Sequence, residues 1–156
     1  MITVEQFCFY TDRALDAQIE ILRDLGDRLV NSHPDLPGAN SPYVIVNHCL
    51  AVMEYWGGHV VAGRESHRDR PGEFTASGSA FELIERAQRA RTQLRDDLAT
   101  MDPAAPPREL PGWDLAPEEA TQGAVMLHVY EELAQHRGQL ELTRDILVAT
   151  AGQGRP

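Results

Sequence analysis

The sequence predicts an all-α protein built as a four-helix bundle. Three observations support this fold class. Four segments repeat apolar residues at intervals of three and four, the spacing of one helical face. No segment carries the alternating pattern of a half-buried strand. Stretches rich in proline and glycine separate the four segments. Four amphipathic helices without strands bury their apolar faces against one another as a bundle.

The first two predicted helices begin with recognisable start signals. The first spans about 3–30, where Thr3 and Gln6 have the spacing of a capping box. The second spans about 42–62, after the loop "NSHPDLPGAN", and a serine and a proline at 41–42 supply an N-cap and a first-turn proline. The apolar face of the first helix contains Val4, Phe7, Leu15, Ile19 and Leu22.

The last two predicted helices follow long connections. The third helix spans about 79–101 and begins with Ser79 and Glu82 in capping-box spacing. The fourth begins near Pro117 and continues to about Val148. The polar stretch "GRESHRDRPGEFTASG" precedes the third helix, and the proline-rich "DPAAPPRELPGWDLAP" precedes the fourth. Both are long enough to cross the bundle or to form a rim that shapes a pocket.

Size and charge limit the class of protein. With 156 residues and 42% hydrophobic content, residues 1–156 suit a single domain with one core. No apolar run is long enough to span a bilayer, and residues 1–30 lack the pattern of a signal peptide, so we expect a cytoplasmic protein. The net charge of −10 disfavours binding to nucleic acid or to anionic membranes. We expect a small molecule or another protein as the partner, and a homodimer is compatible with a bundle.

Three residues form a candidate metal site. "HVYEELAQHRGQLELTRDIL" (128–147) places Glu132 and His136 one helical turn apart, so the two side chains differ by about 40° around the axis. His48 lies in the largely apolar "YVIVNHCLAVMEYW", where an imidazole needs a hydrogen bond or a ligand. Zinc in catalytic sites usually takes three protein ligands, and bundles build such sites from facing helices.

The same residues also suit purely structural roles. A Glu/His pair four residues apart can be a weak surface interaction, and a buried histidine is often satisfied by a carbonyl. His128 lies about 80° around and roughly 12 Å along the helix from His136, so we expect it to line a pocket and not to bind the same ion. Cys8 and Cys49 are expected to be small buried residues.

The motifs "NHCLAVMEYW" and "LHVYEELAQHRGQLELTRDIL" resemble the DinB-like superfamily. The similar branch contains mycothiol-dependent maleylpyruvate isomerase and the mycothiol and bacillithiol S-transferases. The resemblance implies a bundle that holds a divalent metal through His48, Glu132 and His136. A glutamate at 132 is similar to the isomerase-like branch. Residues 136–139 read His-Arg-Gly-Gln in place of His-x-Gly-His, which favours a simpler thiol transferase.

The resemblance therefore implies a metal-dependent S-transferase that joins a mycothiol-like thiol to a small electrophile. Zinc is the first expectation, while Ni, Fe and Mn suit the same donors. No residue beyond the metal ligands is expected to be catalytic, because the thiolate is itself the nucleophile. Arg137 and Arg144 are candidates to bind a carboxylate of the thiol, although both also suit ordinary positions near a helix C-terminus.

Three alternatives are compatible with the same residues. One is a non-catalytic DinB-like protein that binds metal in a stress response. Another is a metal-dependent hydrolase, in which water replaces the thiol as nucleophile. The third is a metal-free helical dimerisation module.

Overall fold

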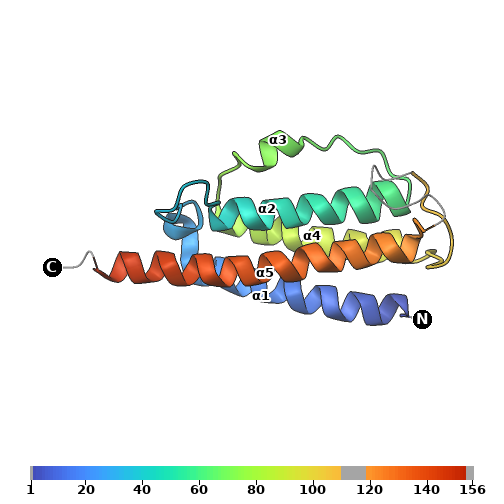
Figure 1. Cartoon of the computed structure of the whole chain (residues 1–156), viewed down its shortest axis with the longest axis horizontal. Coiled ribbons are helices and arrows are strands. Elements are labelled where there is room, and N and C mark those ends of the chain that lie inside the picture. Colours follow the sequence, from blue (N-terminus) through green and yellow to red (C-terminus); the bar gives the residue numbers. More distant parts are fainter. Residues whose placement is uncertain (1, 110–118, 154–156) are drawn as a thin grey trace.

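Four long helices lie side by side along one axis (Figure 1). The structure, a computed structural model, describes residues 2–109 and 119–153, and these contain no strand. The predicted all-α bundle is therefore confirmed. Its long helices are α1 (Val4–Val30), α2 (Pro42–Val52) with its continuation η1 (Met53–Val61), α4 (Ala80–Leu98) and α5 (Gln122–Gln153).

The direction of the helices creates one long crossover. Helices α1 and α5 point one way and α2 and α4 the other, so residues 62–79 return along the outside of α2 before α4 begins (Figure 1). This crossover contains the short helix α3 (Arg70–Glu73), which the sequence patterns did not predict. Asp69 caps α3 by accepting from the backbone N–H of Gly72 at 3.2 Å. A polar segment thereby lies over the middle of α2.

The predicted start signals of α1 and α2 have the expected local chemistry. Thr3 Oγ1 accepts from the backbone N–H of Gln6 at 3.2 Å, and Thr3 N–H donates to Gln6 Oε1 at 3.0 Å. Ser41 caps α2. Ser79 caps α4 by accepting from the backbone N–H of Phe81 at 3.2 Å, in place of the predicted capping-box partner Glu82. These bonds satisfy N–H groups that have no partner within the helix.

Some predicted boundaries are wrong. Helix α5 begins at Gln122, and the predicted start near Pro117 lies outside the described residues. It continues to Gln153 instead of ending near Val148, because alanines at 149 and 151 favour a further turn and no proline interrupts it. Helix α1 is kinked at Gly26, whose φ of +59° is a left-handed conformation that glycine adopts without a Cβ clash. Apolar periodicity continues across this kink and so conceals it.

The second long helix changes from α-helical to π-helical hydrogen bonding along its length. Helix α2 and η1 together match the predicted helix over 42–62, but Met53–Val61 forms a π-helix. A Cβ at Gly57 would lie 2.3 Å from Leu94 Cδ1, so η1 approaches α4 closely where glycine removes the side chain. π-Helical turns occur frequently at functional sites.

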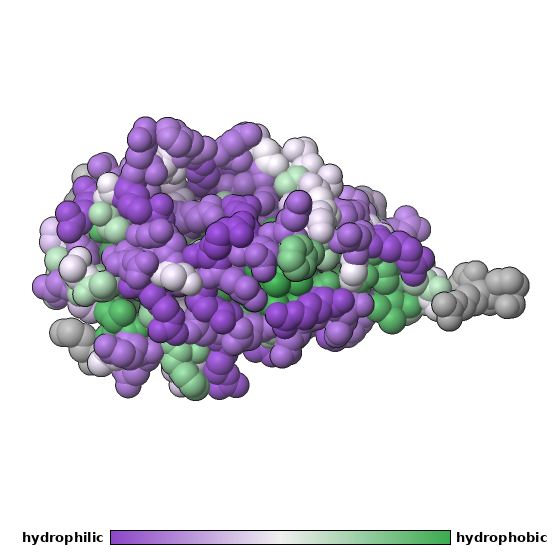
Figure 2. Space-filling view, turned by 180° about the vertical axis from the view of Figure 1, so that it is seen from behind, coloured by the Kyte–Doolittle hydropathy of each residue, from purple (hydrophilic) through white to green (hydrophobic). Residues whose placement is uncertain are grey.

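Apolar side chains from all four long helices form one core. Helix α1 packs against α4 and α5, and α2 packs against α5. Both cysteines are buried, as expected. Hydrophilic residues cover much of the face in Figure 2, and apolar residues gather where α5 projects from the bundle. None of the helices in the described ranges is long and apolar enough to cross a membrane.

A pair of leucines on α5 tests this packing. Leu140 is fully buried in the core, whereas Leu142 is 68% exposed. Leu140→Ala is expected to lower the free energy of unfolding by about 2–5 kcal/mol, because it leaves a cavity. Leu142→Ala is expected to cost less than about 0.5 kcal/mol. Chemical denaturation followed by circular dichroism measures both, and equal losses would contradict the assigned orientation of α5.

Candidate metal centre

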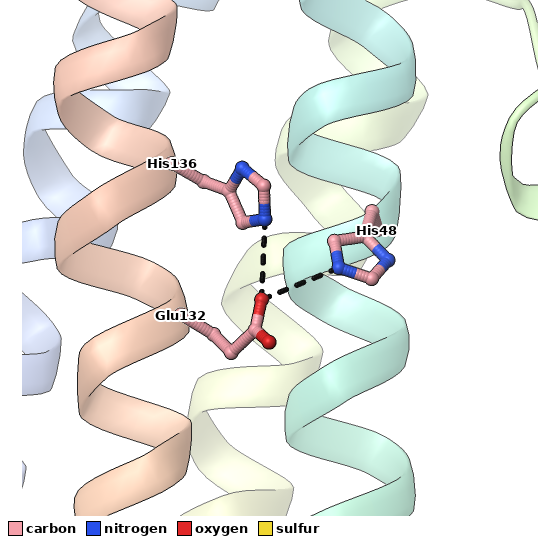
Figure 3. A group of neighbouring side chains, drawn as sticks. All are labelled: His48, Glu132 and His136. Atoms are coloured by element: carbon pink, nitrogen blue, oxygen red, sulfur yellow. Dashed lines mark hydrogen bonds and ion pairs between the residues drawn. The ribbon is translucent and has the colours of Figure 1, made fainter.

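Helices α2 and α5 bring His48, Glu132 and His136 together (Figure 3). One nitrogen or oxygen of each residue lies within 4.8 Å of the others. Glu132 Oε2 is 3.1 Å from His136 Nε2 and 3.4 Å from His48 Nε2. The two imidazole rings meet edge to face with their centroids 5.0 Å apart. Residues 84 positions apart in sequence therefore share one small polar site.

The core sets the direction in which these side chains point. Leu133 and Leu140 of α5 are fully buried, which turns Glu132 and His136 towards α2. Gln18 of α1 donates from Nε2 to the carbonyl of Leu133 at 3.0 Å and holds α5 at this level. The site is closed on its inner side and reached by solvent on the other, since the Glu132 and His136 side chains are 23% and 22% exposed.

Glu132 is the negative charge of the site. The hydrogen bond from His136, followed by the one from His48, holds the pKa of Glu132 far below its ordinary value. The same bond to Glu132 raises the pKa of His136, although burial opposes this shift. Glu132 is consequently ionised at neutral pH and presents a carboxylate oxygen between two imidazoles.

Glu73 is a site residue that the sequence patterns did not reveal. Its Oε2 lies 2.7 Å from His48 Nδ1, and Arg68 donates to both of its oxygens at 2.6 and 3.1 Å. Burial raises the pKa of Glu73, but the hydrogen bonds from Arg68 and His48 outweigh it and leave the pKa below its usual value. No spacing rule joins Glu73 to His48, because the contact depends on the path of the crossover. The only sequence signal nearby is the helix start at Asp69.

Aromatic side chains surround the centre. His128 Nε2 is 3.7 Å from Glu132 Oε1, and the His128 ring meets Trp56 of η1 edge to face at 4.8 Å. Phe74 of the crossover packs against the His48 ring at 5.4 Å. His128 thus lies beside Glu132 but outside the group of three converging donors.

The two predicted thiol-binding arginines lie further along α5. Arg137 Nε donates to Glu141 at 2.9 Å, and Arg144 pairs with the adjacent Asp145 at 2.8 Å. Both guanidinium groups are partly exposed. Their binding of a thiol carboxylate stays a prediction.

The three converging donors suit a divalent cation. Two imidazole nitrogens and one ionised carboxylate are ligands that zinc, iron, nickel and manganese all accept. Within residues 2–109 and 119–153, no fourth His, Cys, Asp or Glu joins the group. Three protein donors are the number that catalytic zinc sites commonly use.

A family model described as mycothiol-S-transferase matches residues 9–149, a range that includes all three donors. The chain belongs to the mycothiol-S-transferase family. The resemblance inferred from the two motifs is thereby confirmed. Membership of this family implies mycothiol and an electrophile as substrates. Neither the curated proteins nor the solved structures contain a match to the chain.

Metal analysis of single variants tests the proposed ligands. Protein purified without chelator is expected to carry about one divalent ion per chain. His48→Ala and His136→Ala are expected to lose it, because each removes a donor. His67→Ala is the matched control, since the His67 side chain is 84% exposed on the crossover. Inductively coupled plasma mass spectrometry measures the content, and full occupancy in both ligand variants would rule out this site.

Proposed function

We propose that this chain is a divalent-metal-dependent S-transferase that joins the sulfur of mycothiol to a small electrophile. The observation that supports it is the convergence of His48, Glu132 and His136 in a chain of the mycothiol-S-transferase family. These three residues hold the cation, with zinc as the first candidate and nickel, iron and manganese as alternatives. Metal analysis of the purified protein would identify which of these ions is bound.

When bound, a cation at these residues would lower the pKa of a coordinated thiol and so favour the reactive thiolate. Glu132 supplies the single negative charge among the ligands, and the two histidines bind as neutral imidazoles. A divalent ion held by these three residues would keep a net charge of about +1, which would favour an anionic sulfur as a further ligand. The partial exposure of Glu132 and His136 gives the thiol a route to that position.

The transfer step needs no nucleophile from the protein. The thiol sulfur attacks the electrophilic carbon and a C–S bond forms, while the bond to the leaving group breaks and that group departs with its electron pair. The thiol proton passes to solvent. The chain's own cysteines do not suit this role, because both are buried and burial raises the pKa of Cys49 to about 12.

Aromatic rings provide a surface for the electrophile. His128 lies beside Glu132, Trp56 packs against His128, and Phe74 lies beside His48. We place the electrophile against these rings, because they offer flat, largely apolar area next to the donors. Arg137 and Arg144 remain candidates for binding a thiol carboxylate.

Two other functions use the same donors. A metal-dependent hydrolase would activate water in place of the thiol. A non-catalytic metal-binding protein of a stress response would favour a closed site with four protein ligands. The partial exposure of Glu132 and His136 favours a reactive site over a closed one. We further propose that residues 1–156 form one cytoplasmic domain that can associate as a homodimer.

A conjugation assay tests the transferase. Metal-loaded protein is expected to accelerate the reaction of mycothiol with monobromobimane, in which a C–S bond replaces the C–Br bond and bromide leaves. Metal-free protein and His136→Ala are expected to give the uncatalysed rate, while His67→Ala retains activity. Fluorescence and chromatography of the conjugate measure the rate.

Controls in this assay separate the alternatives. Omission of thiol distinguishes transfer from hydrolysis, because only a hydrolase would consume the electrophile at an accelerated rate. An absence of acceleration with several low-molecular-weight thiols would refute the transferase and favour a metal-binding role. Equal acceleration by metal-free protein would refute the metal dependence.

A further inference from the structure

The two nitrogens of His48 face different carboxylates. Nδ1 lies 2.7 Å from Glu73 Oε2, whereas Nε2 lies 3.4 Å from Glu132 Oε2. His48 is 7% exposed and Glu73 is 6% exposed, so neither has ready exchange with solvent. An ionised carboxylate only accepts hydrogen bonds, so without a cation the ring can donate to either carboxylate. A cation at Nε2 would require that nitrogen without its proton, and the short contact to Glu73 would then hold the remaining proton on Nδ1. The lone pair of Nε2 then points into the group of donors.

Glu73 is itself held from two sides. Arg68 donates hydrogen bonds to both carboxylate oxygens of Glu73. Its guanidinium carbon also lies over the ring of Tyr55, 5.2 Å from the ring centroid. The backbone carbonyl of Glu73 accepts from the side-chain amide of Asn47 at 3.2 Å. Arg86 donates to the amide oxygen of Asn47 at 2.6 Å. The carboxylate of the crossover is thus fixed relative to α2 before any ligand binds.

We infer that Glu73 is a positioning residue for the metal centre: it selects the His48 tautomer and aims Nε2 at the site shared with Glu132 and His136. This inference rests on the proposed metal site, in which His48 is a ligand. Outer carboxylates that bond a ligating histidine fix its tautomer and raise its basicity. The crossover consequently contributes to metal affinity although it supplies no ligand of its own.

A second arginine–carboxylate pair shows what a purely structural role would look like. Arg64, also on the crossover, donates to both oxygens of Asp97 at 2.8 and 2.9 Å. The Asp97 side chain is 4% exposed, close to the 6% of Glu73. The Arg64–Asp97 pair joins the crossover to α4, whereas the Arg68–Glu73 pair lies within the crossover and reaches α2 through the contact of Glu73 with the proposed ligand His48. Asp97→Asn is therefore a matched control.

The experiment compares Zn²⁺ affinity in the full chain. Competition with a chromophoric chelator gives the Kd of metal-free wild type, Glu73→Gln, Glu73→Ala and Asp97→Asn, with circular dichroism showing that each is folded. Glu73→Ala is expected to bind Zn²⁺ roughly 10- to 100-fold more weakly. Glu73→Gln is expected to lose less, because its amide oxygen still accepts from Nδ1. Asp97→Asn is expected to keep the wild-type Kd.

The outcomes separate the inference from the proposed function. Absence of Zn²⁺ binding by wild type, or unchanged binding by His48→Ala, would overturn the proposed site and this inference with it. Wild-type binding with unchanged Kd in folded Glu73 variants would overturn the inference alone. An equal loss in Asp97→Asn would do the same, because it would reveal a general effect of loosening the crossover. If Glu73→Ala does not fold, the near-isosteric Glu73→Gln tests the inference: weaker Zn²⁺ binding than wild type would support it, and an unchanged Kd would overturn it.

Discussion

A carboxylate held between two imidazoles fixes how α2 faces α5. Polar groups at the interior edge of a bundle are costly unless they are paired. Glu132 meets this requirement with His136 on its own helix and His48 on the opposite one. The buried leucines of α5 turn both of its polar residues inward, so the apolar core and the polar site specify the same helix orientation. Agreement between these two constraints is what makes the donors converge.

The crossover adds a second constraint on the same histidine. Because α2 and α4 point in the same direction, the chain must return along the bundle between them. That return places α3 over α2 and inserts Glu73 behind His48. A long connection of this kind costs little additional closure entropy. Here it supplies a buried ion pair that orients a candidate ligand, so the topology of the bundle and the chemistry of the site are linked.

The sequence predicted what depends on local patterns and on the motifs of one family. Periodicity located the four long helices, and serine or threonine caps located three of their starts. The histidine of α2 and the Glu/His pair of α5 could be named because helical spacing and the DinB-like resemblance both point to them. Glu73, the kink at Gly26 and the π-helical winding of η1 depend on contacts between distant segments. Residue spacing in the sequence does not predict contacts of this kind, which are seen only in the folded structure.

The proposed centre requires three protein donors to hold a cation and leave a place for a thiol. X-ray absorption spectroscopy of the zinc-loaded protein, with and without mycothiol, measures this most directly. We predict nitrogen and oxygen neighbours at about 2.0–2.1 Å without the thiol, and one additional sulfur at about 2.3 Å once it is added. An identical zinc environment in both samples, or sulfur coordination before any thiol is added, would contradict this arrangement.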